Sequence, residues 1–84
     1  MHVNGTYLDV HGLNLEQAIS VINKSISQSF ENGTSLLRVN HGFNNGTKIK
    51  KWCLKEAIKN PLVIKVDNGE NEGISLIYIK TKLF

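Results

Sequence analysis

Two histidines and one aspartate carry the side chains best suited to acid–base chemistry in this sequence of 84 residues. Asp9 and His11 are two residues apart, so on an extended strand both side chains project from the same face. There the carboxylate can orient the imidazole and stabilise its charged form. His41 ends a second apolar run. If the two runs form neighbouring parallel strands, the histidines meet at the strand ends, where open α/β sheets usually bind ligands. The pattern then predicts a general base and a general acid acting on a phosphodiester.

The segment that follows His41 is typical of an anion-binding loop. It holds two glycines and two asparagines and leads into a helix, for which we predict Thr47 as the N-cap. The first N–H groups of a helix are unsatisfied and carry partial positive charge, so they bind phosphate well. The predicted phosphate- and nucleic-acid-binding residues are Gly42, Phe43, Asn44, Gly46, Thr47, Lys48, Lys50, Lys51 and Arg38.

Each of these groups also has a plain structural interpretation. His11 can end a strand with its ring bonded to the backbone, and His41 can serve only to shape the turn. The lysines after Thr47 recur at three- and four-residue spacing, which is typical of a solvated helix face. Asp9 and the two histidines could supply metal ligands, but no paired Cys/His spacing marks a zinc site. We expect no metal and no cofactor.

Length and composition favour one soluble domain covering residues 1–84. The net charge of +3 slightly favours anionic partners. No apolar run approaches the roughly 20 residues of a membrane helix. The first residues show no secretion signal, and the single cysteine, Cys53, fits a reducing compartment. We therefore expect a cytoplasmic protein without a membrane partner.

Apolar periodicity predicts the elements that must position the candidate site. A three- and four-residue spacing predicts two helices. The first begins after the N-cap Asn14 and stops at Asn32-Gly33, and the second covers residues 47–60. Shorter alternating runs predict strands over residues 6–11, 35–40, 62–66 and 74–82.

This order, β-α-β-α-β-β, predicts an α/β two-layer sandwich: a four-stranded mixed sheet with both helices on one face. The residues predicted to face the helices are Leu8, Val10, Leu37, Val39, Ile64, Val66, Ile77 and Ile79. The open face would then carry Tyr7, Asp9, His11, Arg38, Asn40, Lys65, Tyr78 and Lys80. Aromatic rings among basic residues suit single-stranded nucleic acid. The alternative is a solvated or dimerising face, because Leu36 and Leu76 lie on the same side.

Two segments resemble the signature motifs of the Smr (small MutS-related) domain family. That family carries Leu-Asp-x-His-Gly near its start, and here Asp9, His11 and Gly12 match it. It carries His-Gly-x-Gly-x-Gly after its second strand, and here His41, Gly42 and Gly46 match it. The order and lengths of the predicted elements agree with the family along nearly the whole chain, including the final hairpin.

The resemblance implies nucleic-acid binding and, in some members, metal-independent endonuclease activity on DNA or RNA. Family members often form the tail of larger repair or ribosome-associated proteins. The chain departs from the family at Asn44, which replaces the middle glycine, and at Phe43, which often corresponds to a basic residue. Asparagine tolerates positive φ better than most residues, so the loop can keep its shape. Retained binding with lost cleavage is compatible with these departures.

Three hypotheses about function follow. The first is a domain that binds RNA, or branched or single-stranded DNA. The second is an endonuclease that uses His11 and His41, with Asp9 orienting His11. The third is a non-catalytic adaptor that docks on a ribosome or another protein through Phe43 and the open sheet face. Binding through phosphate contacts should weaken steeply as the salt concentration rises, whereas docking through apolar groups should not.

Overall fold

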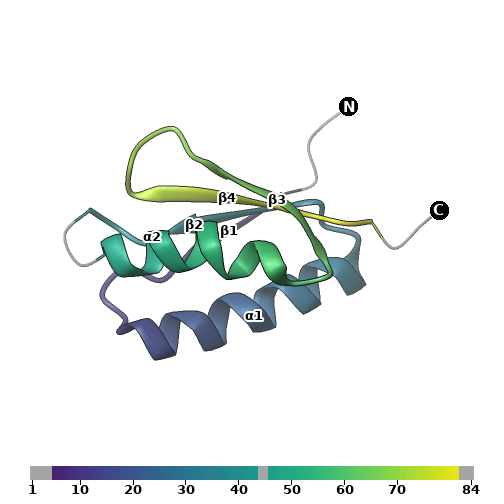
Figure 1. Ribbon diagram of the computed structural model, residues 1–84. Coiled ribbons are helices and arrows are strands. Elements are labelled where there is room, and N and C mark those ends of the chain that lie inside the picture. The colour runs from purple at the N-terminus through teal and green to yellow at the C-terminus, as the bar shows by residue number, and fades with distance from the viewer. Residues whose placement is uncertain (1–4, 44–45, 82–84) are drawn as a thin grey trace.

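The computed structural model describes residues 5–43 and 46–81 (Figure 1). These residues form β-α-β-α-β-β in chain order, as the sequence predicts. The elements are β1 (Gly5–Asp9), α1 (Leu15–Asn32), β2 (Leu36–Asn40), α2 (Gly46–Lys55), the 3-10 turn η1 (Ala57–Lys59), β3 (Val63–Asn68) and β4 (Ile74–Ile79).

The strands form one mixed sheet in the order β1-β2-β4-β3. β1 runs parallel to β2, and β4 runs antiparallel to both of its neighbours. Figure 1 shows α1 and α2 on the same side of the sheet, as expected of right-handed βαβ crossovers. The predicted two-layer α/β sandwich is confirmed, and β4 lies between β2 and β3 in the sheet.

α1 follows its sequence signals closely. The Asn14 side chain accepts from the Gln17 N–H at 2.8 Å, and the Gln17 side chain accepts from the Asn14 N–H at 3.2 Å, which completes a capping box. The helix ends at Gly33, whose N–H donates to the carbonyl of Phe30. The predicted N-cap and stop are both confirmed.

One apolar core lies between the helices and the sheet. Its fully buried members from α1 are Ala18, Ile22 and Ile26, and those from β2 and β4 are Leu37, Val39, Ile77 and Ile79. Burial raises the pKa of the Cys53 thiol to about 12, so this core cysteine stays protonated and unreactive at neutral pH.

The predicted inward position of Ile64 is wrong, because its side chain is 59% exposed. The register of β3 against β4 shifts between Val63 and Lys65, so Ile64 is the extra residue of a β-bulge. Val63 takes the buried place instead, paired with Ile79. The bulge restores the expected face for Lys65, whose ammonium lies 4.8 Å from the centre of the Tyr78 ring.

α2 differs from its prediction at both ends. It begins at Gly46, so Thr47 lies inside the first turn and is not the N-cap. It ends at Lys55 and not at Asn60, after which the chain tightens into η1. Pro61 disfavours a helical conformation for the residue before it, and Asn60 is extended with ψ 127°. The last turn therefore closes with the shorter bond from the Asn60 N–H to the Ala57 carbonyl.

The strand ends differ from prediction by smaller amounts. β1 stops at Asp9, and the next residues turn, with the Leu13 N–H donating to the Val10 carbonyl at 3.2 Å. β3 continues to Asn68, and β4 ends at Ile79. The predicted end of the last strand at Lys82 lies outside the described residues. None of the helices in the described ranges is both long and apolar enough to span a membrane.

Candidate functional site

Asp9 and His11 form a pair at the exposed end of β1. The Asp9 Oδ1 lies 2.5 Å from the His11 Nδ1 and also accepts from the His11 backbone N–H at 3.1 Å. The bond from the His11 side chain is the main reason why the pKa of the Asp9 carboxyl lies below its usual value. An ionised carboxylate only accepts, so Nδ1 carries a proton, and in the neutral ring Nε2 is the free acceptor. The pair therefore presents the basic nitrogen of an exposed imidazole.

The two sequence motifs meet at this point. The Val10 N–H donates to the Asn40 carbonyl at 2.9 Å, which continues the pairing of β1 with β2. Gly42 has φ 81°, a left-handed conformation that favours glycine, and a Cβ added there would lie 3.4 Å from the His11 Cβ. His11 thus stands directly beside the loop that follows β2.

The His41 side chain lies inside the protein, with 2% of its surface exposed. Its Nδ1 lies 3.1 Å from the Gly42 carbonyl, which can only accept, so Nδ1 donates. Its Nε2 lies 2.9 Å from the Ser75 hydroxyl and accepts from it in this tautomer. Burial is the main cause that lowers the pKa of His41, and the nearby Lys50 charge adds to it. The structure thus brings the two histidines to neighbouring loops but does not bring both rings to one surface.

The buried position of His41 follows from the alternation of side chains along β2, which can be read from the sequence. His41 continues the alternation of Leu37 and Val39, which face the core, whereas Asp9 and His11 alternate with the inward Leu8 and Val10. Ser75 is the residue that sequence reasoning missed. It is a fully buried polar residue on the same face of β4 as Ile77 and Ile79. A buried hydroxyl normally has a hydrogen-bond partner, so a serine at a core position indicates a second polar group beside it.

Because His41 is buried as a neutral group, it makes the stability of the fold depend on pH. The unfolded chain binds a proton to this histidine near its ordinary pKa of 6.5, and the folded chain binds it only at lower pH. We therefore expect the free energy of unfolding to fall as the pH drops below about 6.5, by up to about 1.4 kcal/mol per pH unit. Urea unfolding between about pH 7.5 and about pH 5.5 measures this slope.

The matched variant for this prediction is His41→Gln, which keeps hydrogen-bonding groups but cannot be protonated. It should show a flatter pH dependence than the wild type over the same interval. The Asp9 carboxyl does not affect this measurement. Its contribution to the free energy of unfolding is lost only as the pH falls through its lowered pKa, which lies below 3.8. Equal slopes for the two proteins would show that His41 is not the group responsible.

The base of the loop after β2 is fixed by the backbone of Gly73. The N–H groups of His41 and Gly42 both donate to the Gly73 carbonyl, at 2.9 and 3.1 Å. A Cβ at position 73 would lie 3.3 Å from the Phe43 ring and 3.4 Å from the Gly42 backbone, so only glycine fits comfortably.

The side chain of Asn40 makes two further contacts beside this loop. Its Oδ1 accepts from the Gly42 N–H at 3.1 Å, and its amide nitrogen donates to the Tyr7 hydroxyl. Asn44, one of the predicted phosphate-binding residues, lies outside the described part of the chain.

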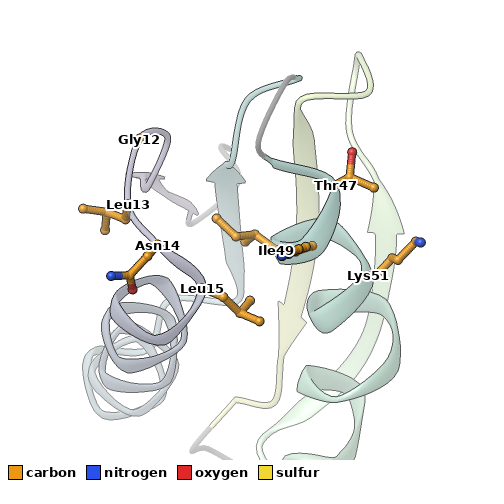
Figure 2. Close-up of a pocket in the computed structure, with 8 residues that line it drawn as sticks. Gly12, Leu13, Asn14, Leu15, Thr47, Ile49 and Lys51 are labelled. Atoms are coloured by element: carbon orange, nitrogen blue, oxygen red, sulfur yellow. The ribbon is translucent and has the colours of Figure 1, made fainter.

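A groove of about 650 Å³ separates the starts of the two helices (Figure 2). Figure 2 shows Leu15 and Ile49 in the space between the helices, with Thr47 on the α2 side. The lining residues are Gly12, Leu13, Asn14, Leu15, Thr47, Lys48, Ile49 and Lys51. The groove thus combines two helix N-termini with two lysines and contains no acidic side chain. Within residues 5–43 and 46–81, no ion pair involves Lys48, Lys50 or Lys51.

Two basic residues of the open sheet face, Arg38 and Lys65, are arranged differently. Arg38 forms an ion pair with Glu70, and Lys65 lies 3.2 Å from a carboxylate oxygen of Asp67. Their charges are therefore largely balanced by acids of the same protein. The predicted phosphate ligands thus divide into two groups: the lysines of α2 line the groove or the loop beside it, and Arg38 lies on the opposite face of the sheet. In the described ranges, no cluster of three His, Cys, Asp or Glu side chains is placed to hold a metal ion.

Comparisons with known proteins agree with the motifs. The family model described as Smr domain matches residues 8–80. Among solved structures, the Smr domain of Thermus thermophilus MutS2 is similar in fold, with a TM-score of 0.82 and 16% sequence identity. That alignment covers 89% of this chain and 98% of the other. A comparison with curated protein sequences gives no significant match.

Proposed function

Because this chain belongs to the Smr domain family, we propose that it is a nucleic-acid-binding protein that cleaves RNA with His11 as the general base. The observation that supports this proposal best is the exposed Asp9–His11 pair beside the Gly42 loop. The carboxylate holds the proton on Nδ1 and leaves Nε2 free to accept one. In RNA, the 2′-hydroxyl next to the scissile phosphate is a nucleophile already in place, so a single base can start the reaction.

The proposed reaction is a transesterification. His11 takes the proton from the 2′-hydroxyl, and the 2′-oxygen bonds to phosphorus while the bond to the 5′-oxygen of the next nucleotide breaks. The leaving oxygen takes a proton from solvent, which gives a 2′,3′-cyclic phosphate and a 5′-hydroxyl. Lys48 and the first N–H groups of α2 stabilise the charge that develops on the phosphoryl oxygens. His41 is a positioning residue, because its ring ties the Gly42 loop to Ser75.

We assign the phosphate site to the groove between the helix starts. Its charge supports this assignment, because Lys48 and Lys51 line it and none of its lining residues is acidic. The predicted contact runs from phosphate oxygens to the N–H groups of the first α2 turn, from Gly46 to Ile49.

This assignment predicts that inorganic phosphate shifts the amide resonances of Thr47, Lys48 and Ile49 in a nuclear magnetic resonance titration. The reference signals are amides at the far end of α1, such as those of Ser29 and Glu31, which should stay in place. A crystal grown with sulfate should show the anion at the same N–H groups. Amide shifts of equal size throughout the protein, or none at the start of α2, would contradict the assignment.

An adaptor role is the second candidate function, and the observation that favours it is the exposed Phe43 side chain. In that case the chain would dock on a ribosome or another protein and would not need His11. The dependence of binding on salt separates the two functions. Binding through phosphates weakens steeply as salt rises, whereas docking through apolar groups does not.

A further inference from the structure

Phe43 is 65% exposed, yet it is held in a defined place. One edge of its ring lies against the backbone of Gly73, where even a methyl group would come within 3.3 Å of the ring. The two hydrogen bonds to the Gly73 carbonyl fix the residues just before it. The ring is therefore supported on one side and offers the rest of its surface to solvent, as a stacking platform does.

A small pocket of about 110 Å³ adjoins this ring, lined by Gly42, Phe43, Thr47, Lys50 and Glu72. Its charges differ from those of the groove between the helix starts. Lys50 supplies hydrogen-bond donors, and Glu72 supplies acceptors. A phosphate would be repelled by the Glu72 carboxylate, whereas the edge of a nucleic-acid base carries both donors and acceptors and no net charge. The pocket therefore fits a base better than it fits a phosphate.

We propose that Phe43 stacks on an unpaired base of the bound strand, whose hydrogen-bonding edge faces Lys50 and Glu72. This inference rests on the proposed RNA binding and adds that the bound strand is unpaired at this position. A base inside a duplex has both faces covered and its pairing edge occupied, so it cannot fill this pocket. Thr47 lines both the groove and the pocket, so the phosphate and the base of one strand can occupy them together.

The test is the affinity of a labelled oligoadenylate RNA for the wild type and for Phe43→Leu, measured by fluorescence anisotropy. Leucine keeps an apolar contact with Gly73 but has no aromatic face. Stacking on an aromatic side chain is worth about 5- to 150-fold in affinity per base, so the variant should bind that much more weakly. Phe43→Tyr should bind as the wild type does. Ile64→Ala, which truncates a similarly exposed apolar residue on β3, should have no effect.

A strand of the same length with abasic sites separates stacking from phosphate binding. The wild type and Phe43→Leu should bind this strand equally, because it offers no base to stack. If Phe43→Leu binds oligoadenylate as tightly as the wild type does, the proposed stacking of a base on Phe43 is wrong, whereas binding through phosphate contacts is not contradicted. If the wild type binds neither strand in a salt-sensitive way, nucleic-acid binding itself is overturned, and the inference with it.

Discussion

His11→Ala should lower the rate of RNA cleavage by about 100- to 10,000-fold, the usual contribution of one general base. The His11 side chain is exposed and its ring bonds only to the neighbouring Asp9 among the described residues, so its loss should leave the fold intact. Affinity for RNA should also change little, because the lysines and the helix starts remain. Single-turnover kinetics with excess enzyme measures the chemical step apart from binding.

Asp9→Asn is the matched variant for this experiment. It keeps the shape of the side chain but removes the charge that holds the proton on the His11 Nδ1. Its rate should therefore fall by less than that of His11→Ala, and its dependence on pH should change. A His11→Ala protein with the wild-type rate would remove His11 from the mechanism.

Reversing two charges in the groove should have the largest effect on binding. Lys48→Glu with Lys51→Glu should weaken RNA binding by about 100-fold or more at low salt, because carboxylates would then face phosphates. The slope of log affinity against log salt should become shallower by about two, since two phosphate contacts are lost. Anisotropy titrations over a range of salt concentrations give both quantities.

The control for this variant is Lys24→Glu with Lys55→Glu. It changes the net charge by the same amount at exposed positions on α1 and α2 that do not line the groove. General electrostatic attraction would weaken equally in the two variants. If the control loses as much affinity as the groove variant, the phosphate site between the helix starts is wrong.

Features that depend on near neighbours in the chain were predictable. Asn14 and Gly33 cap α1 because a capping side chain and a terminal glycine act within a few residues. The alternation along β2 was equally local, and it applies to His41 as well. Taken one residue beyond Val39, it places His41 on the core face, opposite to Asp9 and His11. The sequence therefore held the information that the two rings point to different faces.

Features that depend on distant partners were not predictable in the same way. The bulge at Ile64 arises from how β3 pairs with β4, and no local pattern marks it. The Gly42 loop is fixed by Gly73, and His41 by Ser75, both more than 30 residues along the chain. The ion pair between Arg38 and Glu70 also joins distant segments. It balances the charge of Arg38, which the sequence alone had predicted to bind phosphate.

The most direct test of the central claim compares wild type and His11→Ala on one single-stranded RNA and on its DNA counterpart, with the products identified by mass spectrometry. The proposal predicts that the highly purified wild type cleaves the RNA to fragments ending in a 2′,3′-cyclic phosphate. It also predicts that DNA, which lacks the 2′-hydroxyl, is not cut and that His11→Ala is inactive on both. The same low background rate for both proteins on every substrate would contradict it, and the chain would then be a binding module without this catalytic activity.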